Sequence, residues 1–95
     1  MEKSIKAVGF TLTQGNNELI EKKLKRLSYA EDYIVTLSMT VKYEKAFKVD
    51  TTVNFKWGAQ AHVSTEDADF AAAVNENVDT LDAKVSKEKE KNIGR

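Results

Sequence analysis

The sequence predicts an α+β domain, a two-layer sandwich in which a four-stranded sheet carries both helices on one face. Three observations lead to this fold class. Residues 33–43 and 47–57 alternate apolar and polar side chains, the period of a half-buried antiparallel strand. Residues 70–85 place apolar side chains three or four positions apart, the period of an amphipathic helix. A length of 95 residues allows one modest core, so the order β-α-β-β-β-α is expected to fold as two layers.

A strand is predicted over residues 4–12, followed by a helix that Thr13 caps. The apolar side chains change parity within this strand, and a β-bulge near Gly9 would explain the change. The hydroxyl of Thr13 can accept a hydrogen bond from a free amide of the first helical turn. Residues 15–17 make a poor first turn and favour a late start of the helix. Its buried face is expected to contain Leu19, Ile20, Leu24 and Leu27.

Three further strands, over residues 33–43, 47–57 and 60–65, are predicted to form a meander joined by two hairpins. The side chains expected to face the helices are Val35, Leu37, Met39, Val41 and Tyr43, then Val49, Thr51, Val53, Phe55 and Trp57, then Ala61 and Val63. The opposite face is left to solvent, lined by threonines with Ser38, Lys42, Asn54, Lys56 and His62.

The last helix is predicted to begin at Ser64 or Thr65 and to continue to about Glu90. Acidic residues follow its start, which suits the positive end of the helix dipole. The domain is expected to span residues 1–91, and residues 92–95 to form a frayed C-terminal tail. The buried stripe of this helix should contain Phe70, Val74, Val78, Leu81 and Val85.

Charge is segregated along the chain although 15 basic and 15 acidic residues give a formal net charge of zero. Residues 66–82 contain six acids and no base, whereas residues 84–95 contain five bases and two acids. A local basic field attracts an anionic partner whatever the net charge, so a basic face can coexist with an acidic end. Charges arranged to suit the helix dipole explain the last helix equally well.

Residues suited to catalysis or metal binding are few. The chain has no cysteine and a single histidine, His62, which the alternation places on the polar face of the sheet. The glycines form no phosphate-binding motif, and Glu66, Asp67 and Asp69 are expected to be helix-start acids. We therefore expect no enzymatic activity, metal, cofactor or small-molecule substrate. No apolar run suggests a signal peptide or membrane span, so a cytoplasmic location without membrane association is expected.

Basic residues form the best candidate binding site. They cluster on the first helix (Lys22, Lys23, Lys25 and Arg26) and on the last (Lys84, Lys87, Lys89 and Lys91). Lys84, Lys87 and Lys91 share one helical face, so two basic stripes could lie side by side as a groove for RNA phosphates. Solvated lysines paired with neighbouring glutamates are the alternative interpretation, and the pattern by itself does not exclude it.

Several segments, in order, resemble one family. Residues 61–75 resemble its strand-to-helix junction, and residues 81–91 its closing lysine-rich helix. Residues 19–27 are similar to its first helix, and Lys42-Tyr43-Glu44-Lys45 to the end of its second strand. The family is that of the ribosome hibernation-promoting factor and ribosome-associated inhibitor A, in its short form. Ala71 stands where the family usually has a tyrosine. Thr80 and Ala83 stand where it often has basic residues, which leaves the middle of the last helix less basic.

This resemblance implies a fold similar to a double-stranded-RNA-binding domain and a bacterial translation inhibitor that acts in the stress response. It implies binding to rRNA in the decoding channel of the small ribosomal subunit, where the protein would exclude mRNA and tRNA. It adds Lys42 and Lys45 to the RNA-binding residues above and predicts a monomer when free. The alternatives are a generic module for structured RNA and a protein-interaction domain that uses a sheet edge.

Overall fold

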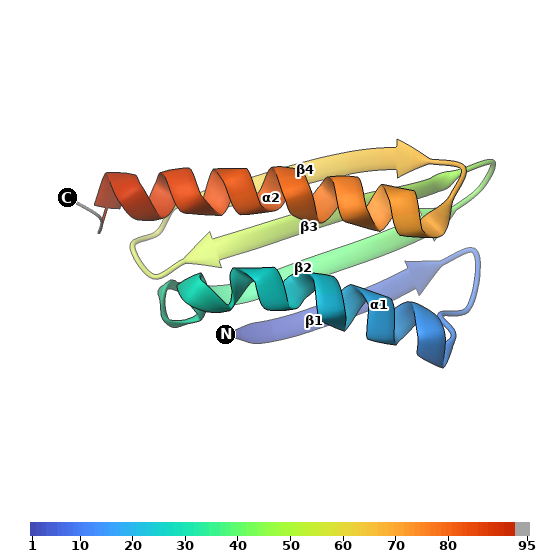
Figure 1. Ribbon diagram of the computed structural model, residues 1–95, viewed down its shortest axis with the longest axis horizontal. Helices are drawn as coiled ribbons and strands as arrows, with labels where there is room; N and C mark the ends of the chain where they lie inside the picture. Colours follow the sequence, from blue (N-terminus) through green and yellow to red (C-terminus); the bar gives the residue numbers. More distant parts are fainter. Residues whose placement is uncertain (93–95) are drawn as a thin grey trace.

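The computed structural model describes residues 1–92 and confirms the predicted α+β class and order of elements (Figure 1). A 3-10 helix that the sequence did not predict, η1, extends the first helix. The elements are β1 (Glu2–Val8), α1 (Gln14–Leu24), η1 (Lys25–Tyr33), β2 (Ile34–Tyr43), β3 (Phe47–Phe55), β4 (Gln60–Asp67) and α2 (Phe70–Asn92).

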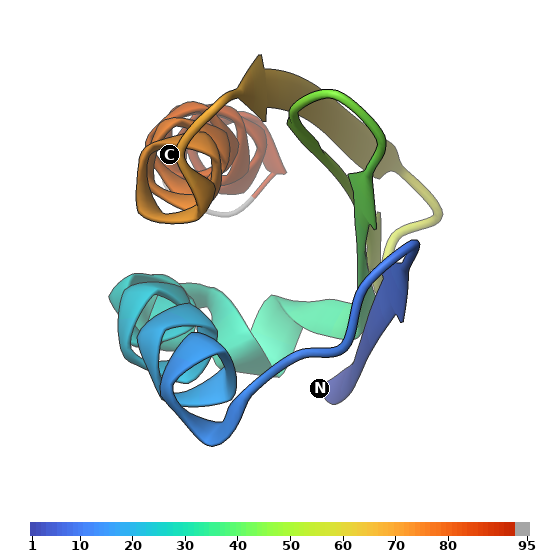
Figure 2. The same ribbon diagram turned by 90° about the vertical axis from the view of Figure 1, so that its right-hand side faces the viewer.

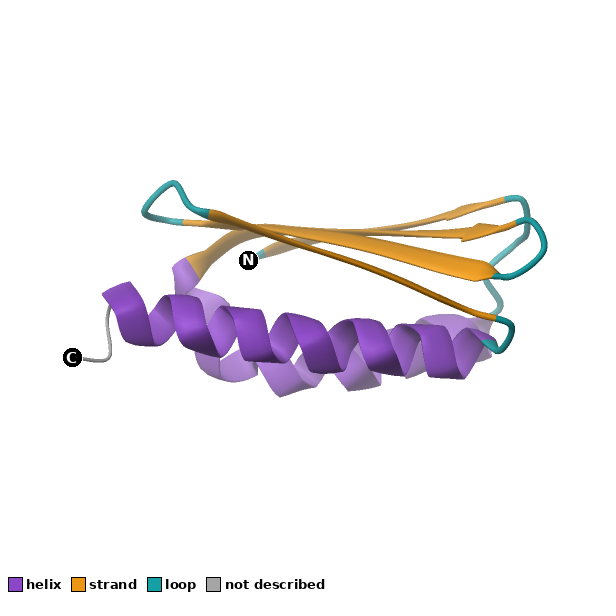
Figure 3. Cartoon of the chain, turned by 90° about the horizontal axis from the view of Figure 1, so that it is seen from above, coloured by secondary structure: helices purple, strands orange, loops and turns teal. Residues whose placement is uncertain are grey.

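The four strands lie in the order β1-β2-β3-β4, with β1 parallel to β2 and the other neighbours antiparallel. Both helices pack on one face of this sheet, as predicted, and the other face is open (Figures 2 and 3). The helices α1 and α2 lie side by side and run in the same direction, so both begin at the end of the sheet that carries the β2–β3 hairpin (Figure 1).

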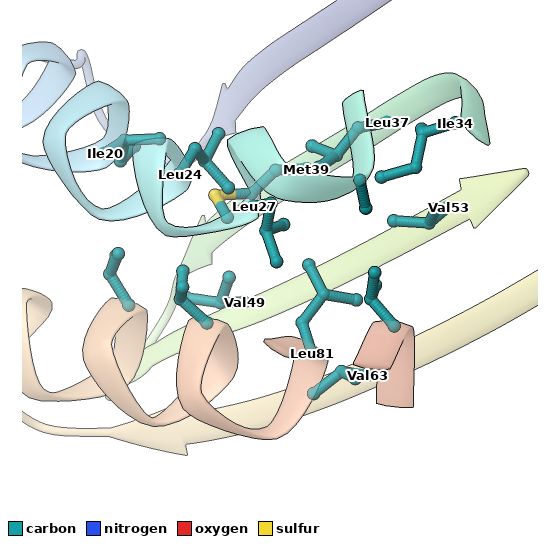
Figure 4. Close-up of a cluster of buried hydrophobic side chains, with 14 of the residues drawn as sticks. Ile20, Leu24, Leu27, Ile34, Leu37, Met39, Val49, Val53, Val63 and Leu81 are labelled. Atoms are coloured by element: carbon teal, nitrogen blue, oxygen red, sulfur yellow. The ribbon is translucent and has the colours of Figure 1, made fainter. Parts of the chain in front are cut away.

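The core lies between the sheet and the two helices (Figure 4). The predicted helical stripes supply much of it, because side chains three or four positions apart share one face of a helix. Removing this apolar surface from water is the main stabilising contribution to the fold. The buried residues from α1 and η1 include Ile20, Leu24 and Leu27. The sheet contributes Leu37, Met39, Val41, Val49 and Val53, and α2 contributes Val74, Val78, Leu81 and Val85.

Two polar residues, Thr51 and Asn77, are buried in this core. The hydroxyl of Thr51 donates a hydrogen bond to Oδ1 of Asn77 at 2.7 Å. The amide Nδ2 of Asn77 donates to the backbone carbonyls of Val49 at 2.9 Å and Val63 at 3.2 Å. Since a buried polar group without a partner is costly, these bonds select one position of α2 over β3 and β4.

The predicted strand over residues 4–12 and its bulge are wrong. The strand β1 ends at Val8, and its register with β2 is regular from Glu2 opposite Thr36 to Val8 opposite Lys42. The chain turns at Gly9, which has φ +84°, and a Cβ there would collide with the carbonyl oxygen of Tyr43. Only glycine fits this approach, so the change of apolar parity comes from a turn rather than from a bulge.

The inward-facing set predicted for β2 and β3 is wrong at Val35, whereas Tyr43 and Trp57 lie on the helix side as predicted but outside the buried core. A register irregularity between Ile34 and Thr36 buries Ile34 and leaves Val35 47% exposed. Because side chains alternate across a strand, an irregularity of this kind shifts by one residue which positions face the helices. The residues before it therefore have the opposite parity to those after it. Tyr43 extends past the core and is exposed. Trp57 lies beyond β3, half-buried, where its ring stacks on Phe55 at 5.2 Å between centroids.

The helix starts also differ from the predictions. Thr13 caps α1 as predicted, with its hydroxyl accepting from the amide of Asn16 at 3.0 Å, but the helix begins at once, at Gln14. The start predicted for the last helix is wrong, because Ser64 and Thr65 belong to β4. A carboxylate oxygen of Asp69 accepts from the amide of Ala72 at 2.9 Å and caps α2. The helix continues through Asn92, and residues 93–95 of the predicted tail lie outside the described residues.

Asn77→Ala is expected to lower the free energy of unfolding by about 1–3 kcal/mol, because it leaves the Thr51 hydroxyl buried without an acceptor. Thr51→Val should also destabilise, and the double variant should lose less than the sum of the two, since both changes break one network. Urea unfolding followed by circular dichroism measures this. Thr80→Ala, an exposed change on the same helix, is the control and should stay within about 0.5 kcal/mol. Additive losses would contradict the coupling.

Candidate RNA-binding surface

Two of the lysines predicted to bind RNA, Lys22 of α1 and Lys25 at the start of η1, lie on the outer side of the helix layer. Lys22 and Lys25 are exposed and line a shallow depression together with Gln14, Asn17, Glu18 and Glu21. Lys23 is half-buried. The structure therefore presents Lys22 and Lys25 to solvent and holds Lys23 closer to the body of the domain.

Arg26, the fourth predicted cation of this group, forms ion pairs across the gap between η1 and α2. Its guanidinium bonds to Asp79, and its Nη2 donates to Oδ2 of Asp82 at 3.1 Å. The hydrogen bond to Asp79 raises the pKa of Arg26 above its usual value, so the side chain stays charged. Both carboxylates compete with any phosphate for the same guanidinium, which makes Arg26 a link between helices as well as a candidate RNA contact.

Tyr29 extends the same link. Its hydroxyl donates to Oδ1 of Asp82 at 2.6 Å and lies 2.8 Å from the hydroxyl of Ser86. Burial, and after it the hydrogen bond to Asp82, raises the pKa of Tyr29. The ammonium of Lys89 lies over the Tyr29 ring, 6.0 Å from its centroid, which is within cation–π range. Lys89 thus belongs to the η1 side of α2.

The structure divides the predicted α2 lysines between two surfaces. Lys84 and Lys87 lie on the side of the helix that faces the β4 edge, where they line a depression with Gln60, Ala61, His62 and Glu88. The ammonium of Lys84 donates to the backbone carbonyl of His62 at 2.9 Å. Lys89 lies on the other side, and Lys91 is exposed near the end of the helix. The residues between η1 and α2 are of mixed charge, because Asp79 and Asp82 pair with Arg26 there.

Further lysines lie at the β2–β3 hairpin, mixed with acidic residues. Lys42 and Lys45, both predicted, line a depression there with Glu44, Ala46, Lys48, Asp50 and Glu66. Lys42 lies 3.9 Å from Glu44. Lys48 is directly opposite Lys42 in the sheet register, so both side chains project from the open face. Sequence reasoning missed Lys48, although the alternation of the two strands together with the hairpin pairing would have placed it there.

The open face of the sheet is polar, as predicted. One register row across it contains Ser4, Ser38, Thr52 and His62. Nε2 of His62 lies 3.7 Å from a carboxylate oxygen of Asp50 on the neighbouring strand. Small hydroxyl side chains can exchange hydrogen bonds with RNA sugars and phosphates at close range. The face can therefore support contacts by shape and hydrogen bonding beside the lysines.

Within residues 1–92, no three His, Cys, Asp or Glu side chains converge in an arrangement that could hold a metal ion. None of the helices described is long and apolar enough to cross a membrane. The exposed lysines described above offer contacts for an anionic partner.

Tyr29 is expected to ionise at higher pH than a free tyrosine, whose pKa is about 10, because its raised pKa favours the neutral hydroxyl. The stability that this gives is present at neutral pH and is lost as the pH rises through the pKa of the folded protein. Titration of tyrosinate absorbance measures it. Tyr29→Phe should remove the part of the absorbance titration that occurs at high pH. Asp82→Asn should shift that part to lower pH. A high-pH component that persists unchanged in Tyr29→Phe would disprove the assignment.

Comparisons with known proteins agree with the fold described above. Residues 4–93 match the family model described as sigma 54 modulation protein / S30EA ribosomal protein. A ribosomal subunit interface protein from Coxiella burnetii superposes with a TM-score of 0.84 at 24% identity, covering 94% of this chain and 98% of that chain. The N-terminal domain of Protein Y from Thermus thermophilus gives a TM-score of 0.80 at 26% identity, covering 93% and 99%. The search of curated protein sequences finds no match.

The family match covers nearly the whole chain, and each structural match covers nearly the whole of both compared chains. The resemblance inferred from the sequence is therefore confirmed. The chain belongs to the family of sigma 54 modulation proteins and S30EA ribosomal proteins, which is the ribosome hibernation-promoting factor family.

Proposed function

We propose that this protein is a bacterial hibernation factor that binds rRNA in the decoding channel of the small ribosomal subunit. There it would exclude mRNA and tRNA and so inhibit translation, with no chemical step of its own. Family membership over residues 4–93 is the observation that carries this proposal. The name of one structural relative, a ribosomal subunit interface protein, supports the same location at the ribosome.

The distribution of cations favours a channel over a single duplex. Lysines lie at the outer side of α1, at the α2–β4 edge and at the β2–β3 hairpin, which are separate sides of the domain. A duplex lying against one face would contact one of these groups, whereas a cavity walled by RNA contacts several at once. Each lysine that neutralises a phosphate releases counterions, which adds affinity without sequence specificity.

The residues proposed to bind RNA fall into two groups, according to whether they already have a partner within the domain. Lys22, Lys25, Lys87 and Lys91 are exposed and form no ion pair within residues 1–92, so they can meet phosphates at little cost. Arg26, Lys84 and Lys89 have partners in the domain. Lys23, Lys42 and Lys45 complete the proposed set. We expect the first four to supply most of the salt-dependent affinity.

Two further features bear on the alternatives. The bond from Lys84 to the His62 carbonyl occupies part of the β4 edge, which disfavours pairing of a partner strand there. Within residues 1–92, the large exposed apolar side chains are Val8 of β1, Val35 and Tyr43 at opposite ends of β2, and Tyr29 of η1. They form no broad apolar patch of the kind that dimer interfaces use, so we propose that the free protein is a monomer.

At low salt, the protein is expected to sediment with small subunits and with whole ribosomes in a sucrose gradient, because the proposed target is rRNA of the small subunit. Added mRNA and tRNA should displace it if they compete for the decoding channel, whereas large subunits should not bind it. Immunodetection across the gradient measures the distribution. The proposal fails if the protein stays at the top of a gradient that contains intact ribosomes, and binding that tRNA and mRNA do not affect would indicate a different RNA site.

The quadruple variant Lys22→Ala, Lys25→Ala, Lys87→Ala, Lys91→Ala is expected to melt nearly as the parent does but to leave ribosomes at lower salt. Each lost phosphate contact should reduce the slope of log affinity against log salt by up to about one unit. Filter binding over a salt series measures the slope. Lys3→Ala with Lys56→Ala removes exposed lysines outside the proposed set and should leave the slope nearly unchanged. An unchanged slope in the quadruple variant would make these lysines ordinary solvated surface.

A further inference from the structure

Tyr43, the last residue of β2, exposes 41% of its surface at the β2–β3 hairpin. Its parity matches that of buried Met39 and Val41, so it projects on the helix side of the sheet, but past the core. The ring leans against Phe47, with centroids 4.7 Å apart and planes inclined by 43°. One aromatic face is thus supported by the protein while much of the residue remains in solvent.

The support beneath Tyr43 is rigid. Phe47 packs edge-to-face against Phe10 at 5.4 Å and against Phe70 at 5.5 Å between centroids. These rings come from the β1–α1 connection and from the start of α2, so three separate segments fix the platform. Gly9 packs directly against the backbone of Tyr43. A ring held in place before binding loses little conformational entropy when a ligand covers it.

Three lysines lie on the same hairpin as this ring. The segment from Lys42 to Lys48 contains three lysines against one acid, Glu44, a net charge of +2. Lys42 and Lys48 face each other across the strand pair and project from the open face, while Lys45 lies in the turn. Proteins hold unpaired nucleotides with exposed aromatic rings and nearby cations, since bases stack on the ring and phosphates meet the cations, and this hairpin carries both kinds of side chain.

The other exposed apolar side chains do not offer this combination. Val8 and Val35 have no aromatic face. Tyr29 is tied to α2 through its hydroxyl, and Lys89 covers its ring. The hydroxyl of Tyr43 makes no side-chain hydrogen bond within residues 1–92, so the ring is not committed to a neighbour in the way that Tyr29 is.

We propose that Tyr43 stacks on an unpaired base of the bound RNA while Lys42, Lys45 and Lys48 contact the phosphates on either side of it. The RNA must be single-stranded or bulged at that point, because the bases of an A-form duplex already stack on one another. The inference rests on the proposed function for the identity of the RNA. The stacking contact lies at one end of the domain and requires an unpaired base. The lysine contacts, by contrast, do not depend on whether the bases are paired.

Affinity for small subunits tests the contact. Tyr43→Leu, which keeps an apolar side chain without an aromatic face, is expected to weaken binding by about tenfold or more, whereas Tyr43→Phe should bind within about twofold of the parent. Val35→Leu, at an equally exposed position of β2, is the matched control and should bind as the parent does. Equal losses in Tyr43→Leu and Tyr43→Phe would overturn stacking, and so would parental affinity in Tyr43→Leu. Tyr43→Ile, a better strand former, replaces Tyr43→Leu if that variant melts early.

A second measurement needs no ribosome and separates this inference from the proposed function. A short single-stranded RNA carrying 2-aminopurine at its centre is titrated with protein, and the emission of the probe reports stacking. Parent and Tyr43→Phe should change the emission in a saturable way, whereas Tyr43→Leu and a duplex containing the same probe should not. If the parent binds small subunits and Tyr43→Leu still changes the emission of the probe as the parent does, the base contact is wrong and the proposed function stands. A Tyr43-dependent emission change in a protein that fails to bind ribosomes would instead support the base contact and overturn the proposed function.

Discussion

The hydrogen bonds of Asn77 fix the position of α2, and the surfaces described above depend on that position. Asn77 is buried and bonds at once to Thr51 and to carbonyls of Val49 and Val63, so it joins the helix to two strands. Valines alone would let the helix slide or rotate over the sheet at small cost, because dispersion contacts are not directional. With the register fixed, Lys84 meets the β4 edge. The acids of the same helix then face η1.

The same register explains how a chain with zero net charge can present cationic surfaces. Asp79 and Asp82 of α2 point toward η1, where they bond to Arg26 and Tyr29. These acids are thereby paired at the surface between η1 and α2, next to one cation, and do not lie among the lysines of α1 or of the hairpin. The positive field on the outer sides is then stronger than the composition suggests. The position of α2 thus explains two features together. It lets these acids join α2 to η1, and it leaves the lysines at the periphery.

The fold could be predicted from periodicity, since the stripe from Val74 to Val85 and the alternation from Leu37 to Val41 each have one physical interpretation. The failures fall where local geometry overrides periodicity. A close approach of Gly9 to Tyr43 ends β1, and the irregularity after Ile34 exposes Val35. In the candidate site, the predicted lysines of α1 and α2 are found at the surface, apart from half-buried Lys23 and Lys89. The partners of Arg26 lie 53 and 56 residues away, so no local pattern could reveal them.

The parallel pairing of β1 with β2 has a consequence for how the chain folds. The strands β2, β3 and β4 are joined by tight hairpins and can pair as soon as they meet, whereas β1 must wait until α1 and η1 have crossed back over the sheet. Closing that long connection is entropically costly, and contacts between distant residues form slowly. Of the four strands of this sheet, the one made first is therefore expected to be the last to join it. During synthesis, β1 would therefore stay unpaired after the other strands of the sheet have been made.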